Sequence, residues 1–203
     1  MIKVIIFDLG SVCFDIDWKK INEDMNKKYG ISTLIRSSYG PKINEIYNKS
    51  QKGEAKMLDV FTEICRDKNL NPKEVTEYYK ELYKKYKKVN KEIKDIIDKL
   101  KNKFKVVCYT DTNDIHFQAH MEQNHLKYFD SAFASFDIGK IKREKGAFDK
   151  IISDLKVKPE EIIFIDDHPK NIDNAKSIGI KTIKFENFDQ MKEDLQKLGV
   201  KII

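Results

Sequence analysis

Four short runs of apolar residues, rich in β-branched side chains, constrain the fold of this chain more than any other feature. They occupy residues 4–7 (VIIF), 105–109 (KVVCY), 162–165 (IIFI) and 181–183 (KTI), and a weaker fifth run covers residues 131–135. Continuous apolar runs of this length are typical of strands that are buried on both faces, as in a parallel sheet. The sequence therefore predicts a parallel sheet with both faces covered.

Segments with a helical spacing of apolar residues separate these runs. The predicted helices cover residues 90–101, 113–124, 144–155, 169–178 and 189–198. Asn90 is suited to cap the start of the first helix, and Gly179 and Gly199 are suited to end the last two. The alternation of strands and helices predicts an α/β fold, a Rossmannoid three-layer sandwich.

Residues 17–88 interrupt this alternation. They hold no convincing strand, and their spacing predicts helices at residues 18–29, 41–49, 54–67 and 72–87. An insertion of this length is too long for a loop in a compact domain. We therefore expect a core formed by residues 1–16 and 89–203, and a helical cap formed by residues 17–88. Ligands of open α/β sheets bind beyond the carboxyl ends of the strands, and the cap leaves from that edge, where it is positioned as a lid.

Polar residues follow three of the predicted strands at their carboxyl ends. They are Asp8, the pair Thr110 and Asp111, and the pair Asp166 and Asp167. A lysine-rich loop at residues 140–145 lies between the second and the third of these positions in the sequence. Close carboxylates repel one another unless a cation joins them, and hard oxygen ligands select Mg²⁺. The sequence therefore predicts a magnesium site at this edge of the sheet.

This set of residues suits phosphoryl transfer. A Mg²⁺ ion held by Asp8 and Asp167 would also bind a phosphate oxygen, and Asp8 would attack phosphorus to form an aspartyl phosphate. The Thr110 hydroxyl and the following backbone N–H would hold the transferring group, while a lysine would neutralise its remaining charge.

The order of these motifs resembles that of the haloacid dehalogenase (HAD) superfamily over nearly the whole chain. The motifs are VIIFDLGSV at the first strand, VVCYTDTN at the second, Lys142 within IGKIKREKGAF, and IIFIDDHPKNIDNAKSIGIKTI at the last. The helical insert resembles the C1-type cap of the superfamily, and the string FDLGSVCFDID resembles its glucose-1-phosphatase-like branch.

The resemblance implies a role for each matching residue. Asp8 would be the nucleophile and a Mg²⁺ ligand, together with the Gly10 carbonyl and Asp167, and Asp166 would act in the outer sphere of the metal. Thr110 and the Asp111 N–H would bind phosphate, and Lys142 would stabilise the transferring group. Arg143 stands where the family usually has proline, and Lys140 and Lys145 are alternative lysines, but the spacing from Gly139 favours Lys142.

Gly10 is the main departure from the pattern, because most phosphatases of the superfamily carry an acid–base aspartate at that position. General acid–base help is typically worth about 10²–10⁴ in rate. Asp15, Asp17 and His168 are the candidates to replace it, and His168 is also a candidate to touch the substrate. The alternatives are a substrate with a good leaving group, such as a sugar 1-phosphate, or a degenerate protein that binds phosphate or a partner without efficient turnover.

Other classes of function are weighed against the phosphatase. A 2-haloacid dehalogenase would form an ester on the same aspartate without metal, which leaves the pair Asp166 and Asp167 unexplained. Receiver domains place their acidic pair after the first strand, whereas the pair in this chain follows a later strand, so that class is excluded. The absence of a Walker A loop excludes P-loop nucleotide hydrolysis. His116, His120 and His125 have a spacing that suits zinc, but no further ligand completes the set, so we expect exposed helix histidines.

Composition limits the partners and the compartment. The net charge of +6 is spread along the 203 residues, and only the run at 78–88 (YYKELYKKYKK) is both basic and aromatic. A solvated helix with inward-facing tyrosines explains this run better than nucleic-acid binding. Cys13, Cys65 and Cys108 form no paired motif, and no apolar stretch is long enough for a membrane span. We expect a cytoplasmic enzyme that acts on a small phosphorylated metabolite and binds neither nucleic acid nor membrane; the sequence does not determine its oligomeric state.

Overall fold

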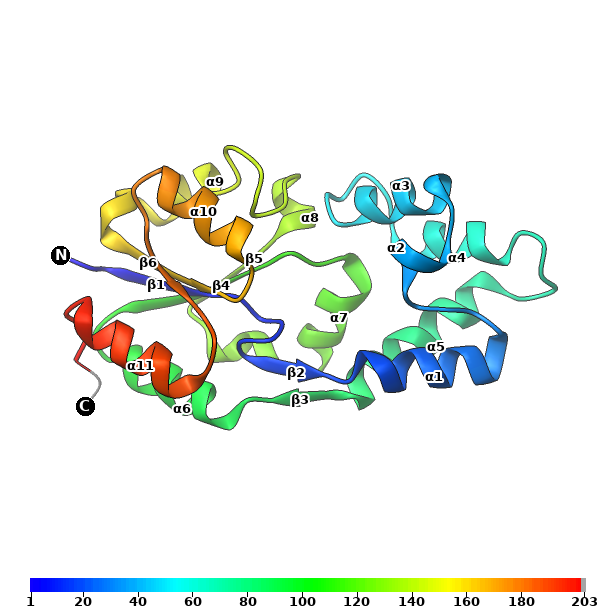
Figure 1. Cartoon of the computed structure of the whole chain (residues 1–203), viewed down its shortest axis with the longest axis horizontal. Coiled ribbons are helices and arrows are strands. Elements are labelled where there is room, and N and C mark those ends of the chain that lie inside the picture. Colours follow the sequence, from blue (N-terminus) through cyan, green and yellow to red (C-terminus); the bar gives the residue numbers. More distant parts are fainter. Residues whose placement is uncertain (202–203) are drawn as a thin grey trace.

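The computed structural model describes residues 1–201 and contains a five-stranded parallel sheet (Figure 1). The strand order is β5-β4-β1-β6-β7. The strands are β1 (Val4–Phe7), β4 (Lys105–Thr110), β5 (Ser131–Ala134), β6 (Ile162–Asp166) and β7 (Lys181–Lys184). Phe7 pairs with Cys108 of β4 and with Ile165 of β6, so the ends of the three central strands lie level. All five predicted strands and the parallel sheet are confirmed.

Helices cover both faces of the sheet, because successive side chains of each strand point to opposite sides. Ile5 and Phe7 pack on one face with α6 and α11, whereas Val4 and Ile6 pack on the other with α9 and α10 (Figure 1). The core helices are α6 (Lys91–Leu100), α7 (Asp114–Glu122), α8 (Ser135–Ile138), α9 (Asp149–Leu155), α10 (Pro169–Ser177) and α11 (Phe188–Lys197). Two 3₁₀ turns, η1 (His125–Tyr128) and η2 (Pro159–Glu161), join them. This arrangement is the predicted three-layer α/β sandwich.

The insert forms a separate cluster of helices at one end of the molecule (Figure 1). Its helices are α1 (Trp18–Tyr29), α2 (Ile35–Ser38), α3 (Pro41–Ser50), α4 (Met57–Cys65) and α5 (Pro72–Lys85). They share a hydrophobic core of their own, which includes Ile21, Met25, Phe61 and Tyr79 and extends onto Ile115 and Ala119 of α7. We call α1–α5 the helical unit.

A short antiparallel ribbon that the sequence did not predict connects the helical unit to the core. Its strands are β2 (Phe14–Ile16) and β3 (Lys87–Val89), with Asp15 opposite Lys88. We expected no strand in the insert, and a helix to residue 87, but α5 ends at Lys85. A three-residue strand is too short to show a recognisable alternation of apolar residues. Its pairing partner also lies more than 70 positions away in the sequence, so no hairpin pattern marks it.

The expected helix at residues 144–155 is wrong in its first turn. Residues 144–148 are irregular, and α9 begins only at Asp149. Gly146 has a positive φ of +77°, and the Asn174 side chain binds the backbone carbonyl of Glu144. The left-handed conformation of Gly146 breaks the helical hydrogen-bond pattern, and the bond from Asn174 occupies a carbonyl that a helix would use. The segment is therefore a loop.

Several predicted ends and surfaces are confirmed. The Asn90 side chain accepts a hydrogen bond from the Ile93 N–H at the start of α6, and Gly179 and Gly199 have φ values of +90° and +84° after α10 and α11. In the basic run of α5, Tyr79 and Tyr83 are buried as expected, but the solvated face is only partly confirmed, because Lys80 is also buried, in ion pairs with Glu77 and Glu122. No helix within residues 1–201 combines the length and the apolar character that a membrane crossing requires.

Candidate active site

The carboxyl ends of β1, β4 and β6 meet at a hollow of about 220 Å³ beneath the helical unit. Of the residues that the sequence singled out for the reaction, seven line this hollow: Asp8, Gly10, Thr110, Asp111, Lys142, Asp167 and His168. The candidates Asp15 and Asp17 do not line it. Asp166, the remaining predicted site residue, is fully buried behind the hollow. A second hollow, of about 390 Å³, adjoins the first and shares Asp8, Gly10 and Asp167 with it. Residues that are distant in the sequence thus meet at one edge of the sheet.

Lys142 joins two of the predicted carboxylates. Its side chain is 1% exposed, its Nζ contacts Asp8 Oδ1, and the same Nζ lies 2.7 Å from Asp166 Oδ2. Lys140 and Lys145 are exposed and reach neither carboxylate. Of the three lysines in the loop, Lys142 is therefore the one that the fold brings to Asp8.

Asp166 is fully engaged by neighbours within its own strand–helix turn. Its Oδ1 accepts hydrogen bonds from the His168 N–H at 2.8 Å and from Asn171 Nδ2 at 3.0 Å, and its Oδ2 accepts from Lys142. A carboxylate with this many donors is held in one orientation. Asp166 therefore positions Lys142 and the turn that carries Asp167, and it is not open to direct metal binding.

The loop that carries Lys142 is fixed from two sides. The Lys142 N–H donates to Asp111 Oδ1 at 2.8 Å, and Asn174 Nδ2 of α10 donates to the carbonyl of Lys142 at 2.6 Å and to that of Glu144 at 2.9 Å. The sequence reasoning did not single out Asn174. Its spacing of three residues after Asn171 on the same helix was the available signal, since both then face the same side.

Burial sets the protonation of this group. It raises the pKa of Asp8 to about 8, and the charges of Asp166 and Asp167 act in the same direction, while Lys142 opposes them. Burial by itself would lower the pKa of Lys142, but the negative charges of Asp166, Asp8 and Asp111 outweigh it and raise that pKa. The centre is therefore short of positive charge, although it already contains a buried ammonium group.

The residues present fit a divalent cation. No group of three His, Cys, Asp or Glu side chains is close enough to form a ready metal cage within residues 1–201. However, Asp8 and Asp167 line the same hollow, and the Asp167 carboxylate has neither a hydrogen bond nor an ion pair to any described residue. Mg²⁺ is usually held by one or two carboxylates, with substrate phosphate and water completing its shell. This donor set suits that pattern.

The three candidates for the missing acid–base group lie in different surroundings. Asp17 accepts a hydrogen bond from the Lys20 N–H and caps α1. The His168 ring accepts a hydrogen bond from the Lys170 N–H through Nδ1, and caps α10. Asp15 lines the second hollow together with Asp8 and has no partner among the described residues. Asp15 is therefore the candidate without another task.

The expectation of exposed helix histidines is wrong. His116, His120 and His125 are 8%, 3% and 8% exposed, because α7 packs against the helical unit and the Phe14 ring of β2 lies 4.7 Å from the rings of His120 and His125. Burial lowers the pKa of His116 to about 3 and that of His120 to about 2. Within the described residues they complete no zinc site. The sequence did not reveal their burial because the cover comes from the insert.

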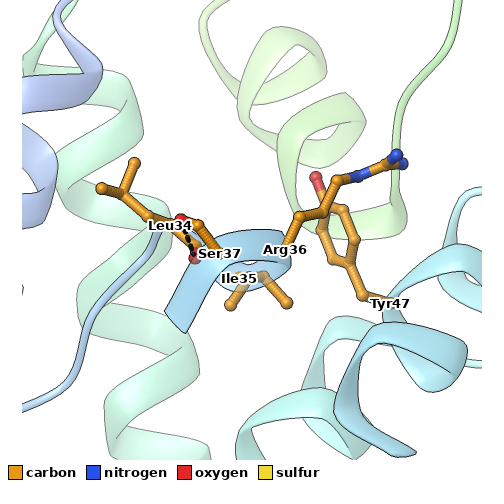
Figure 2. A pocket seen from close by; sticks show the side chains of 5 residues that line it. All are labelled: Leu34, Ile35, Arg36, Ser37 and Tyr47. Atoms are coloured by element: carbon orange, nitrogen blue, oxygen red, sulfur yellow. Dashed lines mark hydrogen bonds between the residues drawn. The ribbon is translucent and has the colours of Figure 1, made fainter. Parts of the chain in front are cut away.

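A separate hollow of about 360 Å³ lies on the helical unit (Figure 2). It is lined by Leu34, Ile35, Arg36, Ser37 and Tyr47. The Arg36 guanidinium carbon lies 5.6 Å from the centroid of the Tyr47 ring, and Arg36 also binds the Asn48 side chain. This hollow contains no carboxylate, and no nucleophile with an adjacent base, so it offers no evident catalytic group.

The sheet, the acidic centre at its carboxyl edge and the helical insert define a Rossmannoid α/β protein with an inserted helical unit. A family model described as haloacid dehalogenase-like hydrolase matches residues 2–179, and the chain belongs to this family of hydrolytic enzymes.

Solved structures and curated proteins resemble the chain over most of its length. A predicted HAD-like family hydrolase from Porphyromonas gingivalis has a TM-score of 0.78 at 26% identity, over 97% of this chain and 98% of that one. A HAD family enzyme from Bacteroides thetaiotaomicron, in complex with magnesium and inorganic phosphate, has a TM-score of 0.75 at 22% identity, over 92% and 95%. D-ribitol-5-phosphate phosphatase from Bacteroides thetaiotaomicron is 28% identical over 96% of this chain and 97% of its own. The chain spans only 37%, 31% and 13% of three other curated relatives.

Proposed function

We propose that this enzyme is a Mg²⁺-dependent phosphatase that hydrolyses a small phosphate monoester through an aspartyl phosphate on Asp8. The contact between Lys142 and one carboxylate oxygen of Asp8 is the observation that carries this proposal. It leaves Asp8 Oδ2 without a hydrogen-bond partner among the described residues, at the wall of a hollow. The similarity to a phosphatase of sugar-alcohol phosphates, and to a structure with magnesium and phosphate, supports the same chemistry.

The reaction balances with the residues of this chain. Asp8 Oδ2 forms a bond to phosphorus, the bond from phosphorus to the leaving oxygen breaks, and that oxygen takes up a proton from Asp15 or from solvent water. Water then attacks the phosphorus of the aspartyl phosphate, which releases inorganic phosphate and regenerates the carboxylate. Lys142 holds the nucleophile, and Thr110 and Asp111 line the position of the transferring group. Mg²⁺ bound by Asp8, Asp167 and the Gly10 carbonyl would screen the repulsion between two anions.

In this proposal the cap consists of residues 17–88, which include the helical unit. The cap shields the hollow from water. Ile16, Trp18 and Tyr83 line the hollow from the ribbon and the helical unit. Exclusion of water strengthens the electrostatic interactions of the charged groups inside.

A screen for phosphate release tests the proposed function. We expect the wild-type chain to release inorganic phosphate from p-nitrophenyl phosphate and from at least one sugar or polyol phosphate, and to lose this activity with EDTA. Asp8→Asn should abolish turnover, and it should also abolish the hydroxylamine-sensitive phosphoenzyme. Asp137→Asn, a change at an exposed carboxylate without contacts, serves as the matched control.

Three outcomes would overturn the proposed function or its mechanism. Full activity of Asp8→Asn or of the EDTA-treated enzyme would exclude covalent catalysis at Asp8 with a metal. Chloride release from 2-chloropropionate in the presence of EDTA, without phosphatase activity, would instead identify a dehalogenase. No turnover across the panel, combined with tight binding of beryllofluoride, would identify a protein that binds phosphate without hydrolysing it.

A further inference from the structure

The wall of the first hollow on the side of the helical unit is made of aromatic rings. Tyr83 and His116 are stacked, with ring centroids 4.1 Å apart and planes inclined by 14°. The Trp18 ring lies 5.7 Å from the Tyr83 ring and 5.5 Å from the His116 ring. Trp18 begins α1, Tyr83 belongs to α5 and His116 to α7, so three elements contribute to one aromatic surface.

The polar atoms of Tyr83 and His116 are already paired with protein groups. The Tyr83 hydroxyl lies 3.0 Å from His120 Nε2, His116 Nε2 lies 2.9 Å from the Tyr79 hydroxyl, and His116 Nδ1 lies 3.3 Å from Asn113 Nδ2. The hydrogen bonds made by these two side chains all go to protein groups, so their rings offer mainly apolar surface to the hollow. Trp18 is 42% exposed and lines both hollows.

The charged residues around the first hollow all belong to the sheet edge. They are Asp8, Asp111, Lys142 and Asp167. Lys142, the only lysine or arginine that lines it, is already paired with two carboxylates. Lys87 Nζ lies 4.6 Å from the centroid of the Tyr83 ring but does not line the hollow. A second anionic group on a substrate would find no free cation on this side.

We propose that the leaving group of the substrate is uncharged and contains a ring, and that Trp18 determines this specificity by packing against the face of the ring. This inference rests on the proposed phosphatase function and adds the class of substrate to it. An aromatic ring and the carbon-bound face of a sugar ring share the necessary chemistry, since both present a flat apolar surface to indole. Substrates with a carboxylate or a second phosphate in the leaving group are disfavoured, because a desolvated charge without a partner is costly.

Trp18 also supplies the readout, because it is the only tryptophan in the chain. We would titrate the Mg²⁺-loaded enzyme with methylphosphonate, phenylphosphonate and phosphonoacetate, and record tryptophan fluorescence and binding heat. The three ligands share a phosphonate group that cannot be hydrolysed. Phenylphosphonate adds an uncharged ring, and phosphonoacetate adds a carboxylate. We expect phenylphosphonate to bind about tenfold more tightly than methylphosphonate and to change the fluorescence, and phosphonoacetate to bind no more tightly than methylphosphonate.

Substitutions at Trp18 separate a specific contact from general packing. Trp18→Ala should remove the roughly tenfold preference for phenylphosphonate, measured by calorimetry, and should leave the affinity for methylphosphonate within about twofold. Trp18→Phe should keep most of the preference. Rates of phosphate release from glucose 1-phosphate and phenyl phosphate then distinguish a sugar ring from an aromatic ring.

The outcomes distinguish this inference from the proposed function. Tighter binding of phosphonoacetate than of phenylphosphonate, or an unchanged preference in Trp18→Ala, would overturn the inference while phosphatase activity persists. Failure of all three phosphonates to bind, together with no turnover in the phosphate-release screen, would overturn the proposed function and the inference together.

Discussion

Lys142 Nζ lies 2.7 Å from Asp166 Oδ2 in an ion pair in which the two side chains are 1% and 0% exposed. The same ammonium group contacts Asp8. The loop before α9 is thereby tied to the carboxyl ends of β1 and β6. A buried ammonium group is stable only with such partners, so the arrangement of Asp8 and the stability of this edge depend on one side chain.

Lys142→Met should affect both activity and stability. The substitution leaves Asp8 and Asp166 buried without their shared cation, which costs about 3–5 kcal/mol of unfolding free energy, and removes a stabilising charge worth about 10²–10³ in kcat. Urea unfolding and phosphate release would measure the two effects. Lys145→Met, an exposed change in the same loop, should alter both by little. Wild-type kcat in Lys142→Met would show that the ammonium group has no part in the reaction.

Gly10→Asp should place an acid–base carboxylate at the position where most phosphatases of the superfamily have one. A Cβ atom at Gly10 would lie 3.9 Å from Asp8 Oδ2, an ordinary contact, and would meet nothing else within 4 Å. We expect kcat for a substrate with a poor leaving group, such as β-glycerophosphate, to rise by about 10–10². The rate for p-nitrophenyl phosphate should change less than about threefold, because its leaving group needs little protonation.

Gly10→Asn is the control for the preceding change, since asparagine has the same size but cannot deliver a proton at neutral pH. An equal increase in Gly10→Asn would indicate a packing effect. If Gly10→Asp raises kcat equally for β-glycerophosphate and for p-nitrophenyl phosphate, that result also contradicts general acid catalysis.

Lys87 in β3 should make stability depend on pH. Burial lowers its pKa from an ordinary 10.5 to about 7, helped by the charge of Lys84, and its Nζ has no hydrogen-bond partner among the described residues. Between pH 7 and 10.5 the unfolded chain then holds more protons than the folded one, so this group makes the free energy of unfolding rise with pH. Lys87→Met should raise stability at pH 7 by at least about 1 kcal/mol and reduce this rise.

The Lys87 prediction is checked by urea unfolding at pH 7, 8 and 9. Lys88→Met, at the exposed neighbouring position of β3, should leave the slope of stability against pH as in the wild type. Parallel pH profiles for Lys87→Met and the wild type would mean that Lys87 is ionised in the folded protein at all three pH values.

Gly53→Ala should loosen the contact between the helical unit and the core. Gly53 has φ +74°, and a Cβ atom there would collide with the Phe136 carbonyl oxygen, next to the ion pair of Lys52 and Glu144. We expect kcat/KM to fall about tenfold. The free energy of unfolding should fall by about 1–3 kcal/mol beyond the cost of placing alanine at a positive φ. Gly30→Ala shares the positive φ, at +62°, but its Cβ would meet nothing within 4 Å. Equal effects of the two variants would exclude the contact with Phe136 as the cause.

The sequence was sufficient for the parts of the fold that repeat a simple pattern. The prediction of a HAD superfamily enzyme with an α/β sandwich is confirmed by the family match and by the solved relatives. Buried parallel strands are recognisable in a sequence as continuous apolar runs. The residues that follow these strands lie close together in the fold, because the carboxyl ends of parallel strands share one edge of the sheet. Lys142 could be preferred over its neighbours from spacing, and the structure places it at Asp8.

Features that depend on contacts between distant segments could not be predicted. The ribbon of β2 and β3 is defined by pairing across the insert, and the burial of His116 depends on Tyr83 of α5. The exposure of Trp18 could not be predicted either, because tryptophan is usually largely buried in folded proteins. The roles of Asp8, Thr110 and Asp167, and the boundaries of the cap, stay predictions.

The two crossings between the core and the helical unit lie side by side, since Asp15 of β2 pairs with Lys88 of β3. The ends of the insert are therefore as close together as the ends of a hairpin, and its length is free to change without moving the sheet. A foreign helical segment joined at these two strands should leave the acidic centre intact while presenting a new wall to the substrate. Evolution could exchange the recognition module of such an enzyme in a single recombination event and keep its reaction.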